Sequence, residues 1–195
     1  QQLKSERIVT QIAGQIRQSL DLDTILNTTV ELVRQFLQTD RVIMFELQPD
    51  GNGKVVVESV ESGWTAIFST SIYDTCLAKS DISSYLQGQA TARTDIYDGD
   101  IDPCHFNLLA QFQVRANLVV PILLGVANKT QESQVDHPSS TPQLWGLLIA
   151  HECTAPRQWQ AMEISLVSQL ATQVGIAIQQ SQLYQQAQME LLERQ

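Results

Sequence analysis

A hairpin signal in the first third of the chain constrains its fold more than any other feature. Residues 40–60, DRVIMFELQPDGNGKVVVESV, hold two runs rich in branched and aromatic side chains, and the turn sequence PDGNG separates them. Two further runs of this kind follow, RANLVVPILL at residues 115–124 and QLWGLLIAHEC at residues 143–153. Because strands joined by a tight turn pair in opposite directions, we expect an antiparallel sheet.

Helical patterns flank these strands on both sides. The first twenty residues carry isoleucines at helical spacing, and residues 20–39 form one apolar face behind a capping Asp21 or Asp23. From residue 158 to the end, apolar side chains recur as in one long helix, which either lies over the sheet or pairs with another helix. This order of elements predicts an α+β fold, with an antiparallel sheet, helices on one face and a pocket on the other.

The segment between the hairpin and the later strands is irregular. Residues 61–103 carry isolated apolar side chains without a sustained period, and we expect short helices only near Ser80–Leu86 and after Asp102. The polar residues 125–142 are expected to form a loop. Long irregular segments inside compact domains are usually functional, so we expect residues 61–103 to cover the free face of the sheet.

Length and charge exclude several classes of protein. A chain of 195 residues suits one ordinary domain. The net charge of −9 and the scattered cationic residues exclude a basic surface for nucleic acid. No uninterrupted apolar run approaches the length of about 20 residues that crosses a bilayer, and no signal peptide opens the chain. We therefore expect a cytoplasmic domain without membrane contact.

The cysteines exclude two further classes of site. Cys76, Cys104 and Cys153 are an odd number, widely spaced and without a CxxC pair. This pattern fits neither a disulfide framework nor a zinc site, so we expect free thiols in a reducing cytosol and no metal.

Cys104 is the first candidate for chemistry. In the sequence DPCH, Asp102 is expected to cap a helix and Pro103 to occupy its first position, which places Cys104 in the first turn. Free N–H groups and the helix dipole favour a thiolate there, as covalent attachment or nucleophilic catalysis requires; a buried structural cysteine is the alternative. His105 diverges from Cys104 by about 100° on a helix, so the two do not form a catalytic dyad and we expect no enzymatic activity.

Three other places are weaker candidates. Asp74 and Cys76 share one side of the chain if the backbone there is extended, whereas an Asx turn at Asp74 is the alternative. His151 ends a strand on its alternating apolar face, where a histidine is either a ligand contact or a hydrogen-bonded core residue. Trp64 is either an aromatic wall of the pocket or ordinary core.

Three blocks of sequence resemble the GAF domain of cyanobacteriochromes, which are bilin-binding photoreceptors. These blocks are PCHFNLLAQFQVRANLVVPILL, LWGLLIAHECTAPRQW and EISLVSQLATQVGIAIQQSQLYQQ. The resemblance extends from about Asp21 to Gln186. It implies a GAF fold with about six antiparallel strands, helices on one face and a linear tetrapyrrole on the other. The chain is then a single domain over 1–195, with an N-terminal helix at 1–20 and the start of a signalling helix at 180–195.

The resemblance also implies roles for the two halves of the site. Cys104 would form the permanent thioether to the A-ring of the bilin, and His105 would pack against its central pyrroles. The sequence DTC at 74–76 is similar to the DxCF motif of a two-cysteine subgroup, in which Cys76 would bind the C10 bridge reversibly and Asp74 would accept hydrogen bonds from pyrrole N–H groups. Leu77 stands where that subgroup has Phe, which leaves phycocyanobilin and phycoviolobilin both open.

Further contacts follow from the same resemblance. Tyr85 would lie near the propionates of the bilin, and either Arg93 or Arg115 would anchor them. His151 would approach the D-ring, with Trp64 stacked near it.

The function implied is reversible photoconversion between a violet- or blue-absorbing state and a green- to orange-absorbing state. It would proceed by Z/E isomerisation at C15 together with making and breaking of the second thioether. The terminal helix would pass the signal to an output domain, such as a histidine kinase, a diguanylate cyclase or a chemotaxis module, and the terminal helices could join a homodimer. The alternatives are a thiol redox sensor and a GAF domain that binds a cyclic nucleotide or another small ligand.

Overall fold

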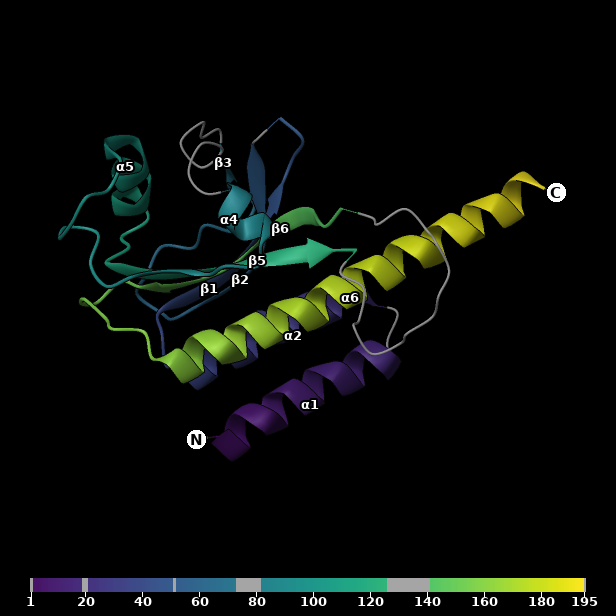
Figure 1. Ribbon diagram of the computed structural model, residues 1–195, viewed down its shortest axis with the longest axis horizontal. Helices are drawn as coiled ribbons and strands as arrows, with labels where there is room; N and C mark the ends of the chain where they lie inside the picture. The colour runs from purple at the N-terminus through teal and green to yellow at the C-terminus, as the bar shows by residue number, and fades with distance from the viewer. Residues whose placement is uncertain (1, 19–20, 51, 73–81, 126–140, 195) are drawn as a thin grey trace.

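The structure is a computed structural model that describes residues 1–195 except 1, 19–20, 51, 73–81, 126–140 and 195 (Figure 1). The helices are α1 Gln2–Gln18, α2 Leu22–Leu37, α4 Ile82–Leu86, α5 Pro103–Gln111 and α6 Ala161–Glu193. The strands are β1 Arg41–Leu47, β2 Gly53–Val60, β3 Ser71–Ile72, β4 Thr91–Arg93, β5 Ala116–Leu124 and β6 Gln143–Glu152.

The strands form one six-stranded sheet in the order β3-β2-β1-β6-β5-β4, and every neighbouring pair is antiparallel. The predicted α+β fold is confirmed, including the hairpin of β1 and β2. The edge strands β3 and β4 were not predicted, because two and three residues are too short to show a period of their own. They lie within residues 61–103, which were expected to be irregular apart from short helices.

Helices α1, α2 and α6 pack together on one face of the sheet, whereas α4 and α5 lie on the other (Figure 1). Helix α2 begins after Asp21, whose side chain accepts a hydrogen bond from the backbone N–H of Thr24, so the first of the two predicted caps is the one used. Helix α6 begins at Ala161, after Gln160 and Glu163 close a capping box, rather than at the expected residue 158.

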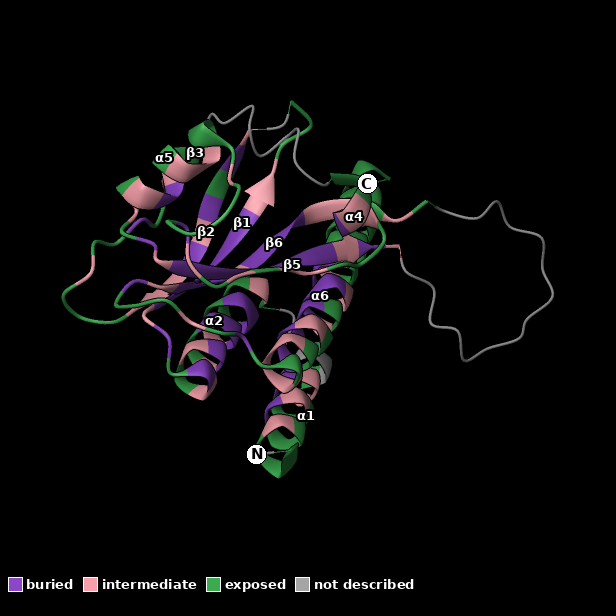
Figure 2. Ribbon diagram, turned by 60° about the vertical axis from the view of Figure 1, so that its left-hand side comes forward, coloured by how far each residue is buried: buried purple, intermediate pink, exposed green. Residues whose placement is uncertain are grey.

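Helix α6 approaches the sheet closely at one glycine. A Cβ added to Gly175 would lie 2.4 Å from the carbonyl oxygen of Leu123 on β5, so only glycine permits this contact. The buried residues of α6 extend from Leu166 to Ile178. The C-terminal part of the helix is exposed (Figure 2) and projects beyond the sheet (Figure 1). The helix therefore has a packed half and a free half.

By length and composition alone, α6 could cross a membrane. It was not identified as such from the sequence, because polar residues interrupt its apolar runs. However, 44% of its most apolar window is buried inside the fold. Packing against β5 and the other helices therefore accounts for much of its apolar character.

The two faces of the sheet bury different side chains because successive residues of a strand alternate. In β1, Val42 and Met44 pack against the helices, whereas Ile43 and Phe45 face the opposite side. Val119 of β5 and Leu147 of β6 join this second cluster. The second face is thus apolar at its centre, and α4 and α5 stand over it.

Candidate functional site

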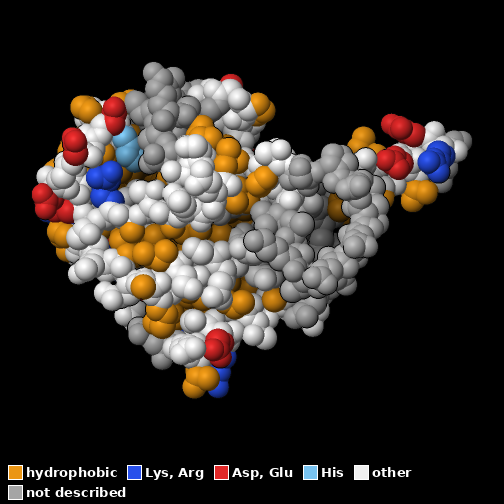
Figure 3. Space-filling view, viewed as in Figure 1, with side chains coloured by type: hydrophobic (Ala, Val, Ile, Leu, Met, Phe, Trp, Pro, Cys, Tyr) orange, Lys and Arg blue, Asp and Glu red, His pale blue; other side chains and the backbone are white. Residues whose placement is uncertain are grey.

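A cavity of about 590 Å³ lies between α5 and the second face of the sheet. This volume is typical of sites for small molecules and cofactors. Histidine, Lys or Arg, and Asp or Glu side chains gather on the surface beside α5 (Figure 3). The polar and sulfur-containing side chains that line the cavity are Tyr85, Thr91, Arg93, Asp100, Asp102, Cys104, His105, Asn117 and His151.

The first turn of α5 places Cys104 and His105 at this cavity. Asp102 is the N-cap and its Oδ1 accepts a hydrogen bond of 2.9 Å from the N–H of Cys104, while Pro103 begins the helix, as predicted. Cys104 is exposed and His105 is partly buried. Both line the cavity, so neighbouring residues that diverge on the helix still reach one space.

The cysteines differ in their chemical state. Cys104 is disulfide-bonded, so the expectation of free thiols does not hold for it. Cys153 is free, as expected, and it is buried. Burial raises the pKa of the Cys153 thiol to about 11, so this side chain stays protonated and unreactive at neutral pH.

His151 lies at the end of β6, is only 3% exposed, and lines the cavity. Burial lowers its pKa to about 3, and electrostatic interactions with the Arg41 guanidinium and with His105 act in the same direction. The imidazole is therefore neutral at physiological pH.

Arg41, the first residue of β1, lies beside His151 and is completely buried. Its Nη1 is 3.3 Å from Nδ1 of His151, and its Nε is 3.3 Å from the Glu58 carboxylate. Sequence reasoning did not single out this residue. A charged side chain that opens an apolar strand, as in DRVIMF, was the available signal.

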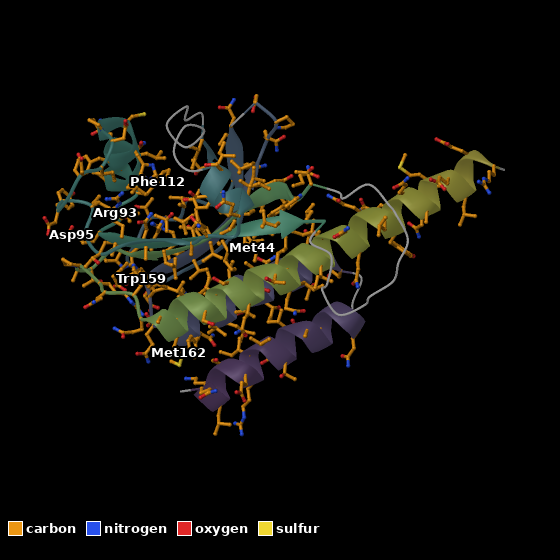
Figure 4. The ribbon with its side chains drawn as sticks, viewed as in Figure 1. Met44, Arg93, Asp95, Phe112, Trp159 and Met162 are labelled. Atoms are coloured by element: carbon orange, nitrogen blue, oxygen red, sulfur yellow. The ribbon has the colours of Figure 1, made fainter. Side chains whose placement is uncertain are left out.

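The two arginines named as carboxylate anchors occupy different positions. Arg93 lies between α5 and the sheet and lines the cavity (Figure 4). Arg115 does not line it, and its guanidinium donates two hydrogen bonds of 2.7 and 2.8 Å to Asp95. Within the part of the chain that the structure describes, Arg93 makes no ion pair. The geometry therefore favours Arg93 as the group available to a ligand carboxylate.

The other candidates fall into three groups. Tyr85, at the end of α4, lines the cavity. Trp64 is partly buried and is not part of the cavity wall. Asp74 and Cys76 lie outside the described residues, so the reversible attachment point remains a sequence-based prediction.

Asn117 is a polar lining residue that sequence reasoning missed. It is 4% exposed, and its Oδ1 has no hydrogen-bond partner in the described part of the protein. It lies on β5 directly across from His151 on β6. A buried acceptor without a donor costs free energy. We therefore expect a ligand in the cavity to donate an N–H or O–H group to this atom. The available signal was one amide side chain inside the apolar run ANLVV.

Among the residues that the structure describes, no group of three or more His, Cys, Asp or Glu side chains could hold a metal ion. The cavity is also not strongly cationic, because Asp100 and Asp102 accompany Arg93 in its wall. Its polar groups instead suit an organic ligand with several hydrogen-bonding edges.

The family model for the GAF domain matches residues 21–178 of this chain. A protein of Synechocystis sp. named as a methyl-accepting chemotaxis protein is 33% identical over 96% of this chain. The circadian input-output histidine kinase CikA of Thermosynechococcus vestitus is 34% identical over 95% of it. The chain spans only 17% and 24% of the lengths of these two curated relatives.

Two solved structures share the fold over nearly their whole length. The blue-light-absorbing form of the Thermosynechococcus elongatus PixJ GAF domain has a TM-score of 0.75 and 34% identity, with coverage of 90% of this chain and 95% of that one. The phycocyanobilin-bound GAF domain of a cyanobacterial phytochrome has a TM-score of 0.77 and 25% identity, with coverage of 92% and 96%. This chain therefore belongs to the GAF domain family, and it is strongly similar in structure to the GAF domains of the cyanobacteriochrome PixJ.

Proposed function

We propose that this chain is a photosensory module that binds a linear tetrapyrrole, or bilin, through a thioether to Cys104. The observation that carries the proposal is the cavity of about 590 Å³ with Cys104 and His105 in its wall. Similarity to GAF domains described as bilin-bound or blue-light-absorbing supports the same function. The proposed ligand is phycocyanobilin or its isomer phycoviolobilin.

The residues in the cavity wall fit such a ligand. Pyrrole and lactam N–H groups are donors of the kind that Oδ1 of Asn117 lacks. Apolar side chains of the central strands, such as Ile43 and Phe45, would contact the flat rings. Asp100 and Asp102 make the cavity less suitable for a cyclic nucleotide, whose phosphate requires cationic or N–H surroundings.

Each lining residue would then meet a different part of the ligand. Cys104 holds one end covalently by addition of its S–H across a carbon–carbon double bond, which needs no leaving group. His105 packs against the central rings, while Arg93, near Tyr85, pairs with the propionate carboxylates. His151 contributes a neutral hydrogen-bonding edge in the cavity wall.

The finer proposal concerns the photocycle. A bilin supplies light absorption and Z/E isomerisation at its C15 bridge. Cys76 is proposed as the second and reversible attachment point and Asp74 as the partner of the pyrrole N–H groups. The resulting states would absorb violet or blue light and green to orange light.

Signalling is proposed to leave the domain through α6, because its C-terminal half projects beyond the sheet (Figure 1). The relatives include proteins named for chemotaxis and a histidine kinase, so the proposed partner is an output domain of that kind or a diguanylate cyclase. The module itself is proposed to be cytoplasmic and without catalytic activity.

Reconstitution with phycocyanobilin under reducing conditions tests the main proposal. The wild-type protein is expected to show zinc-dependent bilin fluorescence after denaturing electrophoresis, and its absorption spectrum is expected to change reversibly on illumination. Cys104→Ala is expected to lose the fluorescent band. Cys153→Ala, which removes a thiol outside the cavity wall, is the matched control and is expected to keep it. A fluorescent band in Cys104→Ala would contradict attachment at this position.

Replacement of Cys76 by Ala tests the photocycle separately. The variant is expected to keep the covalent bilin and lose the violet- or blue-absorbing state. If that state persists, Cys76 is not the second attachment point.

A second candidate function is a thiol redox sensor, and it rests on the disulfide at Cys104. Such a sensor would form and break this bond over the redox range of a cell and would bind no pigment. Bilin that remains unattached after full reduction of the protein, together with reversible oxidation of Cys104, would favour this candidate.

A further inference from the structure

Arg41 is a positive charge buried on the second face of the sheet, with 0% of its side chain exposed. Four groups hold its guanidinium in place. Nη1 donates to the carbonyl oxygen of Phe112 at 2.9 Å, and Nη2 donates to that of Thr65 at 2.7 Å. Nε pairs with the buried Glu58 carboxylate, and Nη1 also lies 3.3 Å from Nδ1 of His151.

Only one assignment of donor and acceptor is possible for the contact between Arg41 and His151. A guanidinium has donors and no acceptor, so Nδ1 of His151 must be the acceptor. A neutral imidazole that accepts at Nδ1 carries its proton on Nε2. His151 lines the cavity whereas Arg41 does not, so the ring nitrogen further from Arg41 is the one left for a ligand.

We propose that Arg41 is a positioning residue, whose guanidinium holds His151 in the Nε2–H tautomer and thereby gives the cavity a fixed hydrogen-bond donor at the end of β6.

The surroundings of His151 support this arrangement. Arg41 on β1 and His105 on α5 are the charged or titratable groups that lower its pKa, in addition to burial. Cys153, 3.8 Å from Nη1 of Arg41, has a raised pKa and stays neutral. Glu58 on β2 pairs with Arg41 and itself accepts hydrogen bonds from the N–H groups of Ile67 and Phe68. The cation is thus anchored on several sides and cannot turn away from the ring.

The consequence for a bound bilin rests on the proposed function. Asn117, across from His151 on β5, presents an acceptor without a partner, and His151 presents a donor. A donor and an acceptor side by side match the carbonyl and N–H of a cyclic amide. Arg41 would thus determine the orientation of a lactam edge that it never touches.

NMR spectroscopy of the ligand-free protein with nitrogen-labelled histidine tests the inference. The chain has three histidines, and His105→Gln and His137→Gln assign the signals by elimination. The spectra distinguish an Nε2–H imidazole, an Nδ1–H imidazole and an imidazolium. The test variant combines Arg41→Met with Glu58→Gln, which removes both buried charges and keeps an amide oxygen for the N–H groups that Glu58 serves. Arg34→Met removes an arginine that pairs with the exposed Glu61 and is the matched control.

The wild-type protein and Arg34→Met are expected to show His151 as a single Nε2–H form at about pH 7. The double variant is expected to lose this single form and populate both tautomers, because nothing then donates to Nδ1. An Nδ1–H or charged His151 in the wild type overturns the inference, even if the double variant does not fold. An unchanged His151 in a folded double variant overturns it as well.

These spectra are recorded on the ligand-free protein, so their outcome does not depend on the proposed function. A chain that shows the expected tautomers and binds no bilin would refute the proposed function alone. A chain that binds bilin and lacks the tautomer dependence would refute only the role of Arg41.

Discussion

At the scale of single residues, the cavity contains a few polar side chains on a sheet face that is otherwise apolar. His151, Asn117 and Arg93 lie on β6, β5 and β4, and each reaches the cavity from a neighbouring strand. Arg41, on β1, lies next to His151, and its guanidinium contacts the carbonyl oxygens of Phe112 and Thr65 and the carboxylate of Glu58. The chemistry of the site is therefore set by a few buried side chains whose protonation and pairing can be measured one by one.

The pKa of His151 predicts a pH dependence of stability. The folded protein keeps the imidazole neutral down to about pH 3, whereas in the unfolded chain it titrates near 6.5. The unfolded state therefore binds the extra proton first, and stability is lost as pH falls below that value. We expect this residue alone to lower the free energy of unfolding by about 2 kcal/mol between about pH 7 and about pH 5. Urea unfolding of the ligand-free protein measures it.

His151→Gln is the control for this prediction, because glutamine does not titrate. Its free energy of unfolding should fall less with acidification than that of the wild type, and the difference isolates His151 from the carboxylates. Equal pH dependences in the two proteins would show that His151 already binds a proton in the folded state.

The two arginines near the cavity predict different effects on ligand affinity. In a Cys104→Ala background, where binding is reversible, Arg93→Gln should weaken phycocyanobilin binding by about 10-fold or more, because a charge-assisted hydrogen bond to a propionate is lost. Arg115→Gln should change the affinity by less than about 2-fold, because Asp95 already occupies that guanidinium. Absorption titration measures both. A larger effect at Arg115 would reassign the anchor.

At the scale of elements, α5 and α6 lie on opposite faces of the sheet (Figure 1). Helix α5 borders the cavity, whereas α6 packs against β5. The Asp-Pro cap begins α5 where Cys104 and His105 line the cavity, and Gly175 lets α6 lie close against β5. A change in the pocket face of β5 is therefore only one strand thickness from the helix that leaves the domain. This proximity supports the proposal that a signal passes from the site to α6.

Gly175→Ala tests the close packing of α6. The added methyl group would meet the carbonyl oxygen of Leu123 at 2.4 Å, so we expect the free energy of unfolding to fall by about 1–3 kcal/mol. Gly14→Ala on α1 is the matched control, because nothing lies within 4 Å of its added Cβ, and helix propensity should make it stabilising by up to about 1 kcal/mol. Thermal or urea unfolding compares the two. A neutral or stabilising Gly175→Ala would show that α6 can move away from β5 at little cost.

At the scale of the whole molecule, the domain has a compact body and one projecting helix (Figure 1). The exposed end of α6 carries large apolar side chains that a monomer leaves in water. They are Leu183, Tyr184, Met189, Leu191 and Leu192.

We expect these side chains to join two copies of the chain, since exposed apolar side chains on a long helix favour pairing with a second helix. Replacement of Leu191 and Leu192 by Glu should convert a dimer to a monomer in sedimentation equilibrium. Phe68→Glu alters an equally exposed apolar residue, 58% exposed, away from α6 and should leave the dimer intact. A wild-type protein that sediments as a monomer would contradict the prediction.

Much of this fold could be predicted from the sequence, because the longer helices and strands show a regular spacing of apolar residues. The hairpin of β1 and β2, the helices α2 and α6, and the cap at Asp102 are local patterns in which each residue meets neighbours a few positions away. Cys104 and its place in the first turn of α5 follow from the same kind of signal. The short strands β3 and β4 do not, because they exist only as edges of a sheet that other strands have formed.

The tertiary structure alone decided how the polar groups of the site are paired. Arg41 and His151 are 110 positions apart, and no pattern in the sequence joins them. The assignment of Arg115 to Asp95, the availability of Arg93 and the orphaned acceptor of Asn117 likewise depend on which strands become neighbours. Local periodicity follows from backbone geometry and can be recognised from residues that are close together in the sequence. Pairing and protonation depend on distance in space, which only the folded chain defines.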